Sequence, residues 1–105
     1  MAWLYLFSAG ILEIVWAFTM KQSDGFTRPV PAAITIVTMI GSFALLSLAM
    51  RSLPLGTAYT IWTGIGAVGA FVIGVTVLGE ALTPMRIAAA ALIVSGLVMM
   101  KLSAS

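Results

Sequence analysis

Four long apolar runs occupy nearly the whole of this chain. A membrane-spanning helix needs about 20 residues, because it rises about 1.5 Å per residue and the hydrocarbon core of a bilayer is about 30 Å thick. Runs of suitable length cover residues 2–20, 29–50, 57–78 and 83–100. The sequence therefore predicts an all-α membrane protein, with residues 1–105 forming a single domain of four transmembrane helices.

Composition supports this fold class and excludes several kinds of function. Of the residues, 62% are hydrophobic and 8% are charged, whereas about 25% are charged in a typical soluble domain. The chain has no cysteine and no histidine, which excludes thiolate chemistry and a histidine-based proton switch or metal site. The net charge of +2 is too small to indicate nucleic-acid binding. We expect no enzymatic activity, no cofactor and no metal.

The links between the runs are short, and their charges are nearly balanced. Such links place neighbouring helices antiparallel, so the pattern predicts an up-and-down four-helix membrane bundle. The positive-inside rule needs a clear excess of basic residues on one side. Either a small bias is enough to orient the chain, or the protein inserts both ways and pairs as an antiparallel homodimer. One end has Lys21, Arg28 and Arg86, and the other has Arg51 and Lys101.

Glu13 is the only charged residue in the first run. A charged side chain at the centre of a membrane helix costs about 2.5–3.5 kcal/mol on insertion-based scales. Glu13 is therefore either a protonated structural group bonded to another helix or a functional site. Its helix neighbours favour function, because Trp16 lies three residues on along the same face and Gly10 leaves open space beside it.

Other polar and aromatic residues fit a cation site around this carboxylate. Tyr59 and Trp62 share one face of the third run, and Ser42 is an isolated hydroxyl near the middle of the second. A carboxylate with aromatic faces attracts a cation. Because no lysine or arginine lies near the middle of a run, the expected partner of Glu13 is a proton or an incoming cation. Competition between the two would make the protein an exchanger.

Small residues mark two further features. Gly64 and Gly66 lie within one turn of the third run, and they indicate either close packing or a bend in the helix. In the last run, small residues recur at spacings that allow close helix contact and form a candidate dimer seam. These residues are Ala91, Ser95 and Gly96.

Three stretches resemble the small multidrug resistance family, and the similarity covers essentially the full chain. They are "GILEIVWAFTMK", "GFTRPVP" and "LPLGTAYTIWTGIGAVGA". Trp16 three residues after the glutamate, together with "IWTGIGA", is similar to the guanidinium exporter subfamily. The resemblance implies a dual-topology antiparallel homodimer in the bacterial inner membrane. It also implies exchange of protons for guanidinium and small substituted guanidines by alternating access.

The resemblance further implies roles for individual residues. Glu13 is the expected shared site for proton and substrate. Ser42 and Trp62 are expected to hydrogen-bond its carboxylate, Tyr59 to extend that network, and Trp16 to form a wall of the pocket.

Remaining roles implied by the resemblance lie around this pocket and in the last two helices. Gly10 and Thr63 are expected to line it or pack against it, while Met39 and Phe43 are expected at a portal for bulkier substrates. The family pattern also implies a kink at Gly64 and Gly66 and dimer contacts along the last helix.

Three other functions remain open from the sequence. One is export of quaternary ammonium or other lipophilic cations, which lack N–H donors for the Glu13 carboxylate. A second is a passive cation channel, for which one polar cluster at mid-membrane offers little continuous wet path. The third is a non-transporting membrane subunit, for which Glu13 would have no effect on any flux.

Overall fold

A computed structural model describes residues 1–103 of the chain, and in these residues it contains four α-helices. They are α1 (Ala2–Gln22), α2 (Pro29–Ala49), α3 (Leu55–Thr76) and α4 (Pro84–Ser103). All four are long and apolar enough to cross a membrane, with mean hydropathies of 1.5, 2.1, 1.6 and 1.8 in their most apolar windows. The expectation of an all-α protein with four membrane-spanning helices is confirmed. Each helix boundary lies within three residues of the run expected from the sequence.

Proline and positive-φ residues set where the helices begin and end. Proline fixes φ near the helical value and needs no N–H partner in the first turn, and both α2 and α4 begin at a proline. The turn after α1 has three successive residues at positive φ, Asp24, Gly25 and Phe26. After α3, Gly79 adopts a φ of +71°, a conformation that glycine accepts without steric cost.

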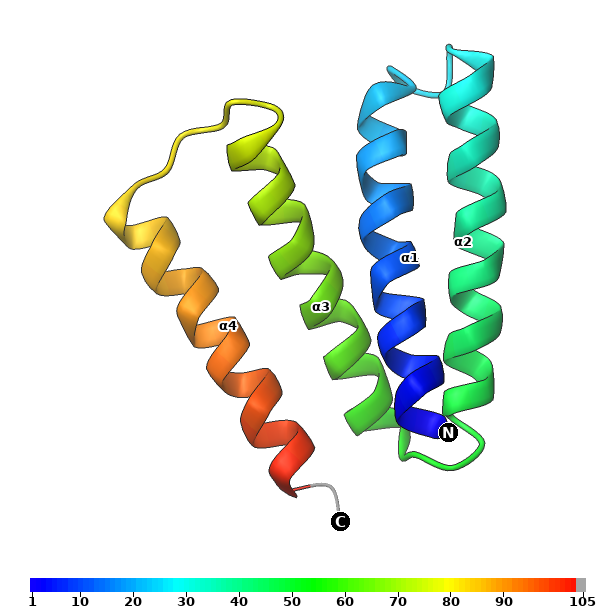
Figure 1. Cartoon of the computed structure of the whole chain (residues 1–105), viewed down its shortest axis with the longest axis vertical. Coiled ribbons are helices and arrows are strands. Elements are labelled where there is room, and N and C mark those ends of the chain that lie inside the picture. The colour runs from blue at the N-terminus through cyan, green and yellow to red at the C-terminus, as the bar shows by residue number, and fades with distance from the viewer. Residues whose placement is uncertain (104–105) are drawn as a thin grey trace.

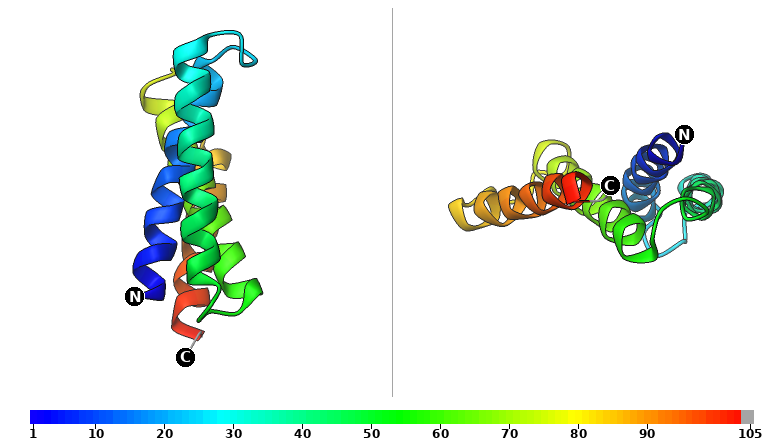
Figure 2. Two further views of the ribbon diagram at one scale, coloured as in Figure 1. Left: turned by 90° about the vertical axis from the view of Figure 1, so that its right-hand side faces the viewer. Right: turned by 90° about the horizontal axis from the view of Figure 1, so that it is seen from below.

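Three of the helices form a group, and the fourth stands at its edge. Figure 1 shows α1 side by side with α2, and α3 on the other side of α1. The backbone of α4 approaches only that of α3 and diverges from it toward the linker at residues 77–83. Seen from below in Figure 2, the helices form a bent row rather than a closed bundle. The molecule is correspondingly flat, with extents of 42 × 35 × 16 Å.

The buried hydrophobic residues lie between α1, α2 and α3, near the end of the molecule that carries the N-terminus. No residue of α4 is buried within this single chain, and its apolar side chains are exposed along the helix. In a membrane those side chains face lipid or another protein. The buried hydrophobic set is Leu6, Ala9, Leu46, Ala49, Ala58, Ile61 and Trp62.

Glycines allow α3 to pack closely against both of its neighbours. The Ile14 side chain of α1 lies against Gly69, where an added Cβ would overlap it, and Leu97 of α4 lies in the same way against Gly64. The contact is reciprocal, because a Cβ at Gly10 of α1 would lie 2.7 Å from the Ile65 side chain. Since lipid tails are as apolar as leucine, membrane helices associate through this kind of van der Waals fit.

Candidate functional site

Glu13 lies where α1 packs against α3, with its carboxyl group directly against Gly66. A Cβ added to Gly66 would overlap the carboxyl group and would lie 2.7 Å from Glu13 Cγ. Glu13 is half-buried and Gly66 is buried. The absence of a side chain at Gly66 therefore creates the space that the carboxyl group occupies.

Two buried polar atoms of α1 have no hydrogen-bond partner in the described part of the chain. They are Glu13 Oε1 and Trp16 Nε1, one acceptor and one donor. A buried polar atom without a partner costs about 1–3 kcal/mol, and more when it carries a charge. The carboxyl group is thus stabilised by any species that brings positive charge or hydrogen-bond donors to it.

Ser42 and Trp62 form a hydrogen-bonded chain beside the carboxyl group rather than with it. Trp62 Nε1 donates to Ser42 Oγ at 3.0 Å, and Ser42 Oγ donates to the Ala9 carbonyl oxygen at 2.7 Å. Each side chain has one proton to donate and has used it. The expected direct bonds from these two residues to the Glu13 carboxylate are therefore replaced in this structure by a link that joins α1, α2 and α3.

Four aromatic rings continue from this link in a row across the three helices. Phe43 lies between the two tryptophans, with ring centroids 6.4 Å from Trp16 and 5.7 Å from Trp62. Tyr59 follows, 5.6 Å from Trp62. Aromatic faces attract cations, so the row forms a favourable surface for a planar cation next to the carboxylate. Phe43, expected at a portal, is 48% exposed and connects the two tryptophans.

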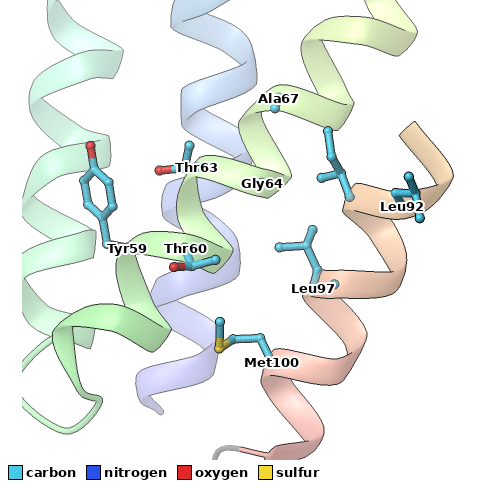
Figure 3. Close-up of a pocket in the computed structure, with 10 residues that line it drawn as sticks. Tyr59, Thr60, Thr63, Gly64, Ala67, Leu92, Leu97 and Met100 are labelled. Atoms are coloured by element: carbon cyan, nitrogen blue, oxygen red, sulfur yellow. The ribbon is translucent and has the colours of Figure 1, made fainter. Parts of the chain in front are cut away.

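An apolar cleft lies elsewhere, between α3 and α4. Its volume is about 490 Å³, and Thr63, expected near the Glu13 pocket, lines it together with Tyr59. Figure 3 shows Leu97 extending from α4 toward α3 close to Gly64. The lining is mostly apolar, so this cleft contains none of the charge that recognition of a cation requires.

The remaining site residues expected from the sequence either pack against a neighbouring helix or lie partly or fully exposed on the surface. Gly10 packs against Ile65. Met39 is half-buried on α2. The three small residues expected at a dimer seam are exposed on α4, where Ser95 Oγ donates to the Ala91 carbonyl at 2.8 Å and nothing lies within 4 Å of a Cβ at Gly96.

Two contributions to the site are not readable from the sequence pattern. One is the Ala9 carbonyl, which accepts the Ser42 proton. The other is the fit of the Glu13 carboxyl group against Gly66, a residue expected from the sequence either in close helix packing or at a bend. The sequence does hint at the contact between Glu13 and Gly66, because each lies near the middle of its apolar run. Two other glycines of α3 lie about as close to the middle, however, so the sequence does not single out Gly66.

Replacing Ser42 with alanine should destabilise the protein by about 1–3 kcal/mol, because it leaves the buried Trp62 N–H without an acceptor. Thermal unfolding in detergent, followed by circular dichroism, measures the change. Ser47→Ala is the matched control, since Ser47 is exposed on the same helix and should change stability by less than about 0.5 kcal/mol. Equal stability of the two variants would contradict the structural role of this link.

Comparison with known proteins gives a consistent result over nearly the whole chain. A family model described as Small Multidrug Resistance protein matches residues 1–93. A protein of Escherichia coli strain K12 named guanidinium exporter is 55% identical over 103 residues, which covers 98% of each chain. Proteins with the same name from Citrobacter freundii and Klebsiella oxytoca are each 54% identical over the same share.

Proposed function

Since this chain belongs to the small multidrug resistance family and is a multi-pass protein of the bacterial inner membrane, we propose that it exports guanidinium and small substituted guanidines in exchange for protons. The names of its relatives support guanidinium as the substrate. The observation that carries the proposal is Glu13 itself, which presents a buried carboxyl oxygen without a partner beside a row of aromatic rings.

Guanidinium fits this site on chemical grounds. It is planar, and its parallel N–H donors match a carboxylate in a two-bond, fork-like geometry. Its flat face stacks on aromatic rings such as those of Trp16 and Phe43. Because a carboxylate holds either a proton or this cation, binding of one releases the other. Alternating exposure of Glu13 to the two sides of the membrane then couples the two flows.

An antiparallel homodimer is the form in which we propose that the exchange operates. A single chain leaves Glu13 only half-buried between α1 and α3, in an open row of helices, and α4 has no buried residue. A second copy would cover these surfaces and contribute its own Glu13. The basic residues, three at one end and two at the other, favour insertion in both orientations.

Uptake into proteoliposomes with an acidic interior tests this function. Outward proton movement should drive guanidinium uptake, and collapse of the pH gradient with a protonophore should end it. Uptake that ignores the gradient would identify a passive channel. Uptake of a quaternary ammonium ion without guanidinium would place the chain with drug exporters, and no flux of either would indicate a non-transporting subunit.

A further inference from the structure

The interface between α1 and α3 contains a smaller cleft, beyond the Glu13 site. It has a volume of about 180 Å³ and lies at the end of the molecule where α1 and α3 finish. Two oppositely charged side chains line it, Lys21 from the last turn of α1 and Glu80 from the linker after α3. The other lining residues are Ala17, Phe18, Ala70, Ile73 and Leu78.

This cleft and the Glu13 site lie on the same helix faces. Lys21 follows Glu13 by eight residues, which places both on one face of α1 about 12 Å apart along its axis. Gly74 follows Gly66 by the same number of residues on α3. Between these levels both helices have alanine, Ala17 and Ala70. The cleft is therefore where the interface that holds the Glu13 carboxyl group reaches the end of the helices.

Glu80 is held in the cleft by the way α3 ends. Its backbone N–H donates to the Gly74 carbonyl oxygen at 2.9 Å, after the chain reverses at Gly79. Its carboxyl group folds back onto α3, so that a Cβ at Gly74 would lie only 2.6 Å from a carboxyl oxygen. The Glu80 side chain thus lies against α3 and lines the cleft opposite α1, although the residue remains exposed.

Lys21 and Glu80 share the cleft without forming an ion pair, since the described residues contain none with a nitrogen–oxygen distance of 4.0 Å or less. The two opposite charges leave the cleft nearly neutral, so it is not suited to hold a monovalent cation of its own. They do attract each other, and that attraction favours closing the cleft.

We propose that Lys21 and Glu80 form an ion pair that closes this cleft in one state of the transport cycle and breaks in the other. Closure brings the end of α3 toward α1 and seals the α1–α3 interface between Glu13 and water on that side. Opening, as in this structure, separates them. This inference rests on the proposed exchange at Glu13, and it adds the pair that controls access to that site.

Charge reversal tests the pair through transport kinetics. Lys21→Glu and Glu80→Lys each place like charges across the cleft, and each should lower the maximal rate of guanidinium exchange by about fivefold with little change in KM, an effect typical of a partly exposed pair. The double variant restores attraction and should return to within about twofold of the wild type. Arg28→Glu makes the same charge change as Lys21→Glu at the same end of the molecule, but outside the cleft. It should behave like the wild type.

Failure of the double variant to exceed either single variant would overturn the proposal, as would an equal loss in Arg28→Glu. Those two results would assign the losses to altered insertion or folding. The double variant keeps the net charge of the wild type, so its recovery cannot come from a changed charge balance between the two ends.

A cysteine pair tests closure directly, because the natural chain has no cysteine. A disulfide needs Cα atoms about 4.4–6.8 Å apart, so Lys21→Cys/Glu80→Cys should form one on oxidation only when the cleft closes. Oxidation should stop exchange and reduction should restore it. Full exchange by completely cross-linked protein would contradict the proposal. Disulfide formation is measured without transport, so it separates failure of this proposal from failure of guanidinium exchange itself.

Discussion

Glu13→Gln should reduce pH-gradient-driven guanidinium uptake to the level of protein-free liposomes. Glutamine has nearly the size of glutamate and fits the same space against Gly66. It has no negative charge to hold guanidinium, and it does not take up and release a proton at the pH of the assay. Uptake of labelled guanidinium by wild-type and variant proteoliposomes, matched for protein content, measures the effect.

The folded state of this variant should be intact, which separates a lost site from a lost structure. A buried carboxyl oxygen without a partner is costly, and a neutral amide reduces that cost. Thermal unfolding in detergent should therefore show the variant at least as stable as the wild type. Retention of gradient-driven uptake by this well-folded variant would disprove exchange at Glu13, and a severe loss of stability would favour a structural role for the carboxyl group.

Gly66→Ala should lower guanidinium exchange by more than tenfold while changing stability little. The added methyl group overlaps the Glu13 carboxyl group, which lies at the end of a flexible side chain and can move aside. Alanine also favours a helix over glycine by about 1 kcal/mol, which offsets the cost of that movement. The carboxyl group is then displaced from its place beside the aromatic row. Guanidinium binding by calorimetry and exchange in proteoliposomes should both weaken.

Two control variants separate this displacement from a change in helix flexibility. Gly64→Ala removes a glycine from the same turn of α3, but its methyl group meets Leu97 instead of Glu13. Gly56→Ala, near the start of α3, meets nothing within 4 Å. If the role of Gly66 is to leave space for the Glu13 carboxyl group, only Gly66→Ala should weaken guanidinium binding strongly. Equal weakening in Gly64→Ala would instead support a bend in α3 as the feature that matters.

The position of Glu13 shows how much of the site the sequence reveals. A lone carboxylate in the middle of an apolar run is expensive wherever the helix lies, so its importance follows from the sequence alone. Trp16 is linked to it by helical spacing. The structure adds which helix the carboxyl group faces. That depends on the rotation of α1 against α3, and the fit of Ile65 against Gly10 and of Ile14 against Gly69 fixes it.

Ser42 shows where prediction from residue type reaches its limit. A hydroxyl with a carboxylate, a backbone carbonyl and an indole N–H in reach has several possible partners, and its choice depends on differences of about an ångström in helix position. In this structure it donates to the Ala9 carbonyl and accepts from Trp62. The residues of the expected network lie close together, but their hydrogen bonds differ from the expected ones.

The position of the Glu80 side chain depends both on the local sequence and on contacts between helices. The glycine at position 79 marks the end of α3 and is recognisable as a turn residue. That the next side chain folds back toward Lys21 depends on the missing side chain at Gly74 and on the nearness of α1.

By itself the sequence determined the four membrane-spanning helices, their short links and the single costly carboxylate, because insertion into a bilayer depends on the apolarity of one segment at a time. Only the tertiary structure decided which residues meet: Glu13 with Gly66, Ser42 with Ala9, and Lys21 with Glu80 across a cleft. In a soluble helix, a polar face shows which side points outward. In these helices every face is largely apolar, so rotation and register follow from the shapes of facing side chains, and those shapes meet only once the helices are packed.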